Sequence, residues 1–407
     1  MKKLEVYYRG WGEHWLLGTL ADNGQRILFE YSARALQESF ELSPRHLPLR
    51  AGSFGAFPAH QQHLPGVIAD ALPDGWGMLL MDRLFRQHGL DLTNLSPLDR
   101  LAFIGERATG ALTFLPATEE LLLPEKIDLA SLAQASKLVL AGDETTALRK
   151  LALIGGSPQG ARPKVLLHYH TKSGELRSEC KVGFAPWLFK FPAQGEHAEV
   201  CALEDLYTKA AALCGIEVPD TKHIALGKGL AAFGIQRFDR DGDLRAPTHT
   251  LAGLLHADFR LPGSVDYLTF LRATQFLTRD EREVEQGFRR IVFNVIFNNR
   301  DDHAKNISFR LGRDRQWRLA PAYDLTFNPG PRGEHQMDVL GEARVITRSH
   351  LVKLGSQASL KVAFVSQAIE QVCVEAQIFI EKSMPDTVRA RSFKRVRQAI
   401  AKTLAHF

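Results

Sequence analysis

The chain has 407 residues, which is enough for two or three domains or for one large bilobal domain. Its composition, 45% hydrophobic and 24% charged, is that of an ordinary globular protein, and the excess of 51 Lys and Arg over 46 Asp and Glu is too small to indicate nucleic-acid binding by itself. No apolar run approaches the roughly 20 residues that span a bilayer, and no apolar signal segment follows Met1, so we expect a cytoplasmic protein without a membrane partner.

The first 60 residues alternate between apolar and polar side chains in three short runs. These runs lie at 4–8, 15–20 and 27–31, and turns rich in Gly, Asp and Asn separate them. Alternation with a period of two is typical of half-buried strands. This part of the chain therefore predicts a small antiparallel sheet or barrel.

Two helices are expected next. The segment L-P-D-G-W-G at 72–77 predicts a turn that opens a helix over 78–85. Ser96 and Pro97 suit the N-cap and first turn of a second helix, and a strand at 111–115 follows it. Nothing in the 72–77 segment has the chemistry of a catalytic residue, so we interpret it as a structural cap that packs on a later part of the chain.

A glycine-rich segment, G-G-S-P-Q-G-A-R-P-K at 155–164, precedes an apolar strand at 165–167. Glycines let backbone N–H groups approach phosphate oxygens closely. The segment lacks the GK[ST] of a Walker loop and is not G-x-G-x-x-G, so the pattern alone favours a flexible hairpin.

Lys190 lies within another short apolar strand, at 187–192. A buried ammonium group needs an anionic partner, and nucleotide phosphates are one such partner. A lysine at a sheet edge with its head group in water gives the same pattern. The residues alone leave these two interpretations open.

The next stretch predicts a helix, a hairpin and a turn. Apolar positions at helical spacing over 199–214 end at Gly215, and a strand-like run follows at 222–226. After the hairpin, Asp239 and Arg240 can pair with each other at a surface turn.

Helices are expected over 250–300, and the last of them carries an apolar stripe over 284–296. It leads into the polar segment D-D-H-A-K-N at 301–306. Asp301 and Asn306 have the D-x-x-x-x-N spacing of kinase catalytic loops, in which the Asp accepts the substrate proton and the Asn holds a metal ion.

A β-hairpin is predicted over 307–319, with its turn at 312–314. Because its strands return to one end, Asn306 and Asp324 should meet there as an amide oxygen and a carboxylate. These are hard oxygen ligands that suit Mg²⁺. The alternative is a solvated polar turn without catalytic function.

The C-terminal part begins with a turn-rich segment at 328–338, where kinases keep an activation segment. Two closing helices are expected at 360–380 and 387–404. The last is basic, with Arg389, Arg391, Lys394, Arg395, Arg397 and Lys402. Such a run favours a solvated face, and a contact with nucleic-acid phosphates is the alternative.

The segments at 301–306 and 321–325 resemble the D-x-H-x-K-N loop and the P-x-Y-D-[IL] metal motif of the HipA family of bacterial toxin kinases. The resemblance implies an α+β fold of the bilobal, protein-kinase-like type, related to phosphoinositide kinases, with an N-terminal β-rich domain. It implies an N-terminal domain at 1–117, a kinase N-lobe at 118–240 and a mostly helical C-lobe at 241–407.

The resemblance also implies roles for individual residues. Lys190 is expected to contact ATP and to pair with Glu204, with Glu199 as the alternative. His303 should orient the loop around Asp301, and Lys305 should touch the γ-phosphate or shield Asp301. Asn306 and Asp324 are the expected metal ligands. The full set of expected ATP contacts is Gly155, Gly156, Ser157, Gly160, Lys190, Glu204, Gln236, Arg237 and Phe238, where the last three form a hinge whose backbone binds adenine. Ser157 matches the serine that the family autophosphorylates.

The function implied by the resemblance is that of a type II toxin, a Mg²⁺- and ATP-dependent serine/threonine protein kinase. Its expected target is a protein such as an aminoacyl-tRNA synthetase, and its expected partner is a helix-turn-helix antitoxin of HipB type, through which it would reach DNA. Two alternatives remain open from the residues: a small-molecule phosphotransferase, and a catalytically silent corepressor that acts with the antitoxin.

Overall fold

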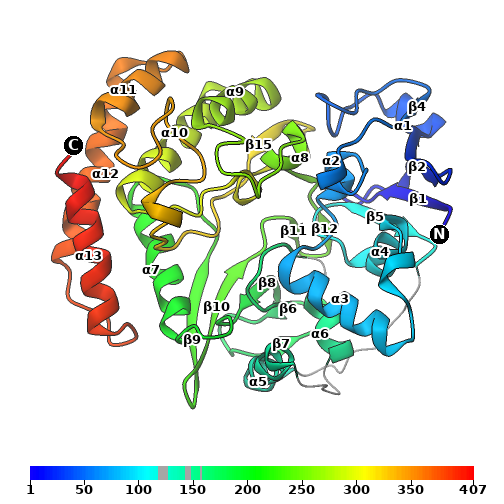
Figure 1. Ribbon diagram of the computed structural model, residues 1–407, viewed down its shortest axis with the longest axis horizontal. Helices are drawn as coiled ribbons and strands as arrows, with labels where there is room; N and C mark the ends of the chain where they lie inside the picture. The colour runs from blue at the N-terminus through cyan, green and yellow to red at the C-terminus, as the bar shows by residue number, and fades with distance from the viewer. Residues whose placement is uncertain (118–126, 143–147, 156–157) are drawn as a thin grey trace. The chain divides into compact units, whose positions relative to one another are not determined.

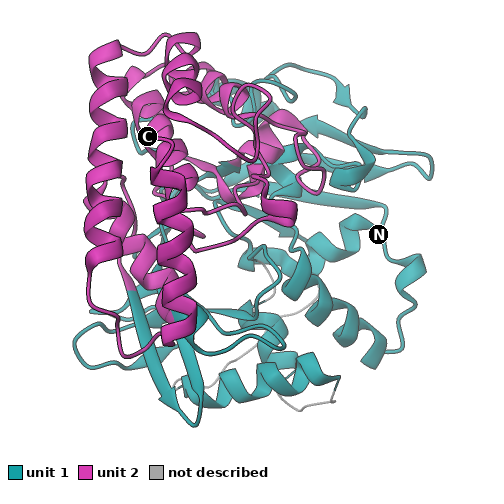
Figure 2. Ribbon diagram, turned by 60° about the vertical axis from the view of Figure 1, so that its left-hand side comes forward, with its two compact units in different colours: residues 1–201, 222–249, 310–315 teal, residues 202–221, 250–309, 316–407 magenta. Residues whose placement is uncertain are grey.

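The structure is a computed structural model that describes residues 1–117, 127–142, 148–155 and 158–407. Its described residues divide into two compact units (Figure 2). Unit 1 comprises Met1–Cys201, Lys222–His249 and Arg310–Arg315, and unit 2 comprises Ala202–Thr221, Thr250–Phe309 and Gln316–Phe407.

Unit 1 begins with the predicted antiparallel sheet, of order β4-β3-β2-β1-β5. The alternation of apolar side chains puts Leu4, Val6 and Tyr8 on the buried face of β1. The strand order places β5 beside β1, although about a hundred residues separate them, with Tyr8 opposite Leu112. The strands are β1 (Lys3–Tyr8), β2 (Trp15–Asp22), β3 (Ile27–Tyr31), β4 (Ser53–Phe54) and β5 (Leu112–Leu115).

Four helices lie between the strands of this sheet in the sequence, and one of them begins where the sequence predicts its cap. Ser96 and Asp99 form a capping box at the start of α4, with Pro97 in its first turn. The longer helix α3 begins at Gly75, three residues earlier than predicted. The helices are α1 (Ala33–Glu38), α2 (Gly66–Ala69), α3 (Gly75–Gln87) and α4 (Pro97–Ile104).

A second sheet in unit 1, of order β7-β6-β8-β10-β9, contains the strand with Lys190. Its core comes from Val165, Phe189 and Phe233, and α6 packs on β6. The strands are β6 (Lys164–Tyr169), β7 (Leu176–Arg177), β8 (Ala185–Lys190), β9 (Thr221–Gly227) and β10 (Leu230–Gln236), and the helices are α5 (Leu129–Ala141) and α6 (Leu148–Gly155). A short hairpin of β11 (Arg240–Asp241) and β12 (Leu244–Arg245) comes next.

Unit 2 is mostly helical, as predicted for the C-terminal part. The apolar stripe of α10 is buried, and α9, α12 and α13 pack on this helix. Figure 1 shows α12 and α13 side by side at the C-terminal end of the chain. The helices are α7 (Glu199–Leu213), whose first three residues belong to unit 1, α8 (Leu251–Leu255), α9 (Tyr267–Thr278), α10 (Glu281–Ile296), α11 (Arg348–Gln357), α12 (Val362–Glu381) and α13 (Ala390–Leu404).

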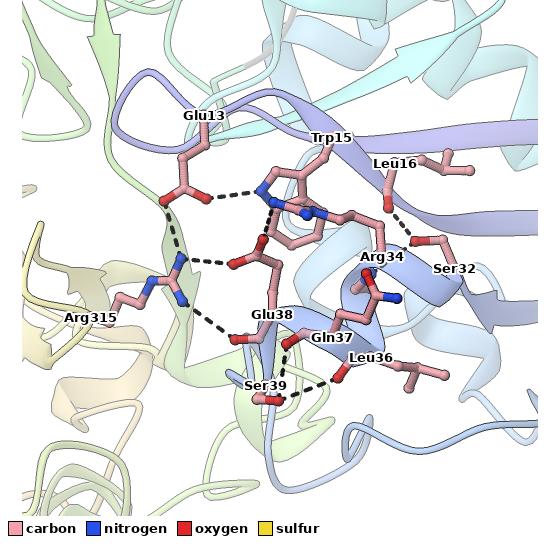
Figure 3. Close-up of polar contacts among 11 residues, drawn as sticks. Glu13, Trp15, Leu16, Ser32, Arg34, Leu36, Gln37, Glu38, Ser39 and Arg315 are labelled. Atoms are coloured by element: carbon pink, nitrogen blue, oxygen red, sulfur yellow. Dashed lines mark hydrogen bonds and ion pairs between the residues drawn. The ribbon is translucent and has the colours of Figure 1, made fainter.

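The predicted hairpin after the polar loop is present as β14 (Ser308–Leu311) and β15 (Trp317–Leu319), in a sheet of order β13-β14-β15 with β13 (Thr248–Thr250). Its turn residue Arg315 contacts two carboxylates of the N-terminal sheet region, at 2.9 Å from Glu38 and 3.4 Å from Glu13 (Figure 3). Glu13 also accepts a hydrogen bond from the Trp15 indole at 2.9 Å. The tip of this hairpin therefore belongs to unit 1. No helix within the described ranges is long and apolar enough to cross a membrane.

Candidate active site

The polar loop after α10 holds two neighbouring carboxylates in very different environments. The Asp302 side chain is fully buried, whereas 48% of the Asp301 side chain is exposed. Asp302 accepts hydrogen bonds from the Tyr267 hydroxyl and, at 2.7 Å, from the Gln336 backbone, and it lies 2.7 Å from Nδ1 of His335. Asp302 therefore fixes the loop, and Asp301 is the carboxylate that a substrate can reach.

The side chain of Asn306, which ends the D-x-x-x-x-N spacing, is hydrogen-bonded to Asp301, which begins it. Its Nδ2 donates to the backbone carbonyl of Asp301 at 2.7 Å. The side-chain amide is therefore oriented, and Oδ1 is the end that it can offer to a ligand.

His303 and Lys305 share an aromatic neighbour that the sequence did not indicate. Phe259 lies with its ring centre 5.3 Å from that of His303 and 4.4 Å from Nζ of Lys305. The His303 Nε2 is 3.9 Å from the Asp301 carboxylate, which is consistent with an orienting role. An ammonium group over a ring face is held by the ring quadrupole, so Phe259 positions Lys305.

The structure brings the segment that contains Asp324 to this loop. The hydroxyl of Tyr323 donates to the backbone carbonyl of Lys305 at 2.8 Å and lies 2.7 Å from the Ser308 hydroxyl. Asp324 itself has a φ of 55°, a left-handed backbone conformation that costs free energy for a residue with a Cβ. A strained carboxylate next to an anchored tyrosine is typical of a functional position.

Unit 1 contains two buried lysines on neighbouring strands. Lys164 and Lys190 are register partners on β6 and β8, and they are 3% and 8% exposed. The Lys190 Nζ lies 5.6 Å from the centre of the Phe233 ring, and Lys164 Nζ donates to the Gln159 carbonyl. Lys190 is thus a buried lysine and not an edge lysine with its head group in water. Lys164 was missed, although its place at the end of the glycine-rich segment could have indicated it.

The glycine-rich segment is held by the 72–77 segment. Asp74 accepts a hydrogen bond from the Gly160 backbone N–H, and the backbone N–H of Trp76 donates to the Gly160 carbonyl at 3.1 Å. A Cβ on Gly75 would lie 2.7 Å from the Ala161 Cα, and the φ of Gly75 is +39°. The interpretation of the 72–77 segment as a cap that packs on a later part of the chain is thus confirmed. We name these contacts the Asp74–Gly160 clamp.

Two glycines of the glycine-rich segment, Gly155 and Gly160, have defined positions in the structure. Gly155 ends α6, where a Cβ would collide with the Lys164 carbonyl oxygen, and Gly160 has a φ of +102°. Both positions thus need glycine. Gly156 and Ser157 lie outside the described residues.

The expected hinge, residues 236–238, begins at the last residue of β10. Gln236 is the last residue of that strand and pairs with Trp187, and the Arg237 N–H donates to the Pro186 carbonyl at 2.9 Å. A role of Arg237 in binding adenine would therefore use its carbonyl group. Phe238 is the next residue, in the turn.

Asp239 pairs with Arg240 at a turn, as the sequence allowed, but the pair is buried and not at the surface. Its carboxylate is bound by Arg237 and Arg240, each at 2.7 Å, and by the Gly110 N–H at 2.8 Å. Burial alone would raise the pKa of Asp239, but the two guanidinium groups hold it well below its ordinary value. The reason for the error is that the Gly110 contact comes from a distant part of the chain.

Glu204 and Glu199 are both buried on α7. Glu204 belongs to unit 2 and Glu199 to unit 1. The pairing of either residue with Lys190 stays a prediction.

Two family models match the chain: the HipA N-terminal domain over residues 4–115 and the HipA-like C-terminal domain over residues 156–378. The second match alone covers more than half of the 407 residues. The chain belongs to the HipA family. In this HipA chain, the Asp74–Gly160 clamp joins residues from the two matched domains, and α13 lies beyond both matches.

Two individual proteins are similar to this HipA chain. A Haemophilus influenzae (strain ATCC 51907 / DSM 11121 / KW20 / Rd) protein named "Putative kinase" is 26% identical over 198 residues, which are 44% of this chain and 54% of that protein. The chain thus spans about half the length of that curated relative. HipA of Shewanella oneidensis MR-1, solved in a complex with HipB and operator DNA, superimposes with a TM-score of 0.72 at 17% identity, over 99% of this chain and 97% of that chain. The expected α+β fold with an N-terminal β-rich part is thereby confirmed, and the bounds 1–117, 118–240 and 241–407 stay a prediction.

Proposed function

We propose that this chain is a Mg²⁺- and ATP-dependent serine/threonine protein kinase. The observation that carries the proposal is the pair of anchors in unit 2: Asn306 on the Asp301 carbonyl, and Tyr323 on the Lys305 carbonyl. These two hydrogen bonds hold an accessible carboxylate, an oriented amide and the segment of a second carboxylate together. Phosphoryl transfer needs this combination because its catalysis is mostly positioning and charge stabilisation.

The residues present fit a magnesium ion. With its Nδ2 engaged, Asn306 can offer an amide oxygen, and Asp324 can offer a carboxylate oxygen. Mg²⁺ takes hard oxygen ligands and few of them from protein, so nucleotide phosphates and water complete such a site. When bound, the ion neutralises charge on the phosphates.

Each remaining group has a role in this proposal. Asp301 positions the substrate hydroxyl and accepts its proton, and His303 orients that carboxylate. Lys305, held over Phe259, contacts the γ-phosphate. The other groups that we assign to ATP are Lys190 with Glu204, Lys164, the glycines of the 155–160 segment and the backbone of 236–238. The meeting of these groups from units 1 and 2 around one nucleotide is itself part of the proposal.

We propose further that the kinase acts as the toxin of a toxin-antitoxin pair. The HipA of Shewanella oneidensis was solved with HipB and operator DNA, and this chain resembles it over 99% of its length. A helix-turn-helix antitoxin is accordingly the proposed partner, and DNA is reached through that antitoxin. An aminoacyl-tRNA synthetase is the proposed class of target, and Ser157 is the proposed autophosphorylation site.

Labelled ATP tests this proposal. Purified wild-type chain incubated with a cell extract and γ-labelled ATP should transfer label to a protein, and the variant Asp301→Asn should not. Asp220→Asn, which changes an exposed carboxylate in unit 2, is the matched control and should behave as the wild type. Label that reaches only sugars or aminoglycosides would indicate a small-molecule phosphotransferase. Undiminished growth arrest by Asp301→Asn in cells would contradict the kinase and favour a silent corepressor.

Autophosphorylation needs its own arm of that experiment. The variant Ser157→Ala should remove the label from the chain itself and leave the label on the target. Label that stays on the chain after this substitution places the modified residue elsewhere.

A further inference from the structure

Unit 2 contains a cavity of about 380 Å³ on which the kinase proposal does not draw. Its walls are the residues before the catalytic loop, the turn-rich segment after Asp324, and one face of α13. Its charged lining is entirely basic. The basic lining residues are Arg300, Arg332, His335, Arg344, Arg395, Lys402 and His406. We call this cavity the basic pocket.

The pocket is built from segments that are fixed to one another. Asn298 Nδ2 donates to Thr403 Oγ1 at 3.1 Å, which holds α13 against the residues before the catalytic loop. Phe393, Val396 and Ile400 anchor the other face of α13 in the core. Arg395 and Lys402 are therefore presented to the pocket by a rigid helix.

Part of the positive charge in the pocket is already compensated. Arg344 pairs with Glu334 at 2.7 Å, and Nδ1 of His335 lies 2.7 Å from the buried Asp302 carboxylate. Arg300 donates to the carbonyls of Pro329 and Gly333, yet its Nε is buried without a hydrogen-bond partner among the described residues. Burial lowers the pKa of Arg300 from its ordinary value, because a charged group loses solvation there. An anion in the pocket would offset that loss.

Three further cations line the pocket: Arg332, Arg395 and Lys402. Within the described part of the chain, the side chains of Arg332 and Lys402 have no hydrogen-bond or ion-pair partner, and Arg395 has only a ring contact, 5.6 Å from the Phe327 centre. Three cations that line one concavity and have no carboxylate partner of their own attract an anion. The pocket is therefore suited to a ligand with more than one negative charge.

The volume and the apolar lining of the pocket indicate a small ligand with an apolar part. A volume of about 380 Å³ is within the usual range for small-molecule sites. Val295, Phe327, Ile346 and Ala399 supply apolar surface beside the cations. Guanidinium groups match phosphate oxygens through paired hydrogen bonds. The other basic residues of α13, such as Arg391 and Lys394, do not line the pocket, so the helix does not present one continuous track for a nucleic-acid strand.

We propose that the basic pocket binds a phosphate monoester carried on a partly apolar body. The same chemistry can come from a free phosphorylated small molecule or from a phosphorylated side chain of a protein. One lining residue, Arg300, directly precedes Asp301 in the sequence, but binding of a phosphate monoester in the pocket requires no kinase reaction.

Calorimetric titration at constant ionic strength tests the proposal. The probes are inorganic phosphate, phenyl phosphate, and a peptide in phosphoserine and serine forms. The double variant Arg395→Gln/Lys402→Gln is compared with the control Arg391→Gln/Lys394→Gln, which removes the same charge from the same helix. All four side chains are exposed, so both variants should fold, and their melting temperatures verify this. We expect phenyl phosphate to bind the wild type and the control alike, and the pocket variant about tenfold or more weakly, since charged hydrogen bonds are lost.

The arms of the titration separate the possible sources of the phosphate. Tighter binding of the phosphoserine peptide than of phenyl phosphate would indicate a phosphorylated side chain, and the reverse order would indicate a free small molecule. Equal weakening in both double variants, or absence of saturable binding to the wild type, overturns the proposal. A single-stranded RNA that binds through Arg395 and Lys402 when no phosphate monoester does also overturns it.

The candidate ATP site is a second possible phosphate site, so one more variant is needed. Phosphate monoester binding that persists in Lys190→Met supports the basic pocket. Binding that is lost in Lys190→Met but kept in Arg395→Gln/Lys402→Gln places the phosphate at the candidate active site and overturns the proposal without affecting the kinase.

Discussion

Lys164 and Lys190 stand opposite each other on β6 and β8, and both side chains are buried. A buried ammonium group is stabilised by anions close to it. Nucleotide phosphates are the anions that the proposed function supplies. The pair is thus the part of unit 1 that most directly favours an ATP site.

Replacing either lysine should weaken ATP binding. For Lys164→Met or Lys190→Met we expect the Mg²⁺-ATP dissociation constant to rise about tenfold or more, because a charged hydrogen bond contributes about 1.5–3 kcal/mol. Calorimetry measures this constant. Lys181→Met, which removes an exposed lysine from the same part of the chain, is the control and should bind ATP as the wild type does. Unchanged affinity in both lysine variants would remove unit 1 from the proposed nucleotide site.

The two aspartates at 301 and 302 should respond to the same substitution in opposite ways. Asp301→Asn should lower the rate of phosphoryl transfer by at least about 10²–10⁴-fold, because the residue that accepts the proton is lost. Its effect on the free energy of unfolding should be small, since the Asp301 side chain is half exposed. Asp302→Asn should instead lower the free energy of unfolding by about 1–3 kcal/mol, because its buried hydrogen bonds are disturbed. Denaturant unfolding and labelled-ATP assays measure the two effects, and a stability loss confined to Asp301→Asn would contradict the assignment.

The Asp74–Gly160 clamp should couple the 72–77 segment to ATP binding. Asp74→Ala removes the acceptor for the Gly160 N–H, so we expect a stability loss of about 1–2 kcal/mol together with weaker ATP binding. Asp74→Asn keeps an oxygen acceptor at the same place and should restore most of both. The measurements are denaturant unfolding and ATP calorimetry. If Asp74→Ala lowers stability but leaves ATP affinity unchanged, the clamp is only structural.

Asp239 should make the stability of the chain sensitive to acid. Its folded-state pKa lies below the ordinary value, so the stabilisation from its ion pairs is fully present above the unfolded-state pKa of about 4 and is lost as the pH falls through the folded-state pKa. Asp239→Asn leaves buried guanidinium groups without their partner, and it should lower the free energy of unfolding at neutral pH by about 3–5 kcal/mol.

The pH series separates this effect from general acid denaturation. Denaturant unfolding between neutral pH and pH 3 should give a difference between the wild type and Asp239→Asn that shrinks as the pH falls. A difference that stays constant over the acidic range would show that protonation of Asp239 does not control it.

Local pattern by itself determined many elements of this protein. The period-two runs at 4–8, 15–20 and 27–31 became β1, β2 and β3, and the helical spacing over 199–214 became α7. These predictions succeed because the hydrophobic period depends only on neighbouring residues and on which side of an element is buried. The 301–306 segment could also be singled out from the sequence, since its polar groups lie within six consecutive positions, and the catalytic roles of those groups stay a prediction.

Only the tertiary structure decided which distant residues meet. The pairing of Lys164 with Lys190, the clamp between Asp74 and Gly160, and the burial of Asp239 against Gly110 each join positions that no local period relates. The basic run of α13 shows the same limit: its spacing indicated the solvated face that the structure has, but not that Arg395 and Lys402 on that face line a cavity. The physical reason is that the fate of a polar side chain depends on what packs against it, and that partner comes from elsewhere in the chain.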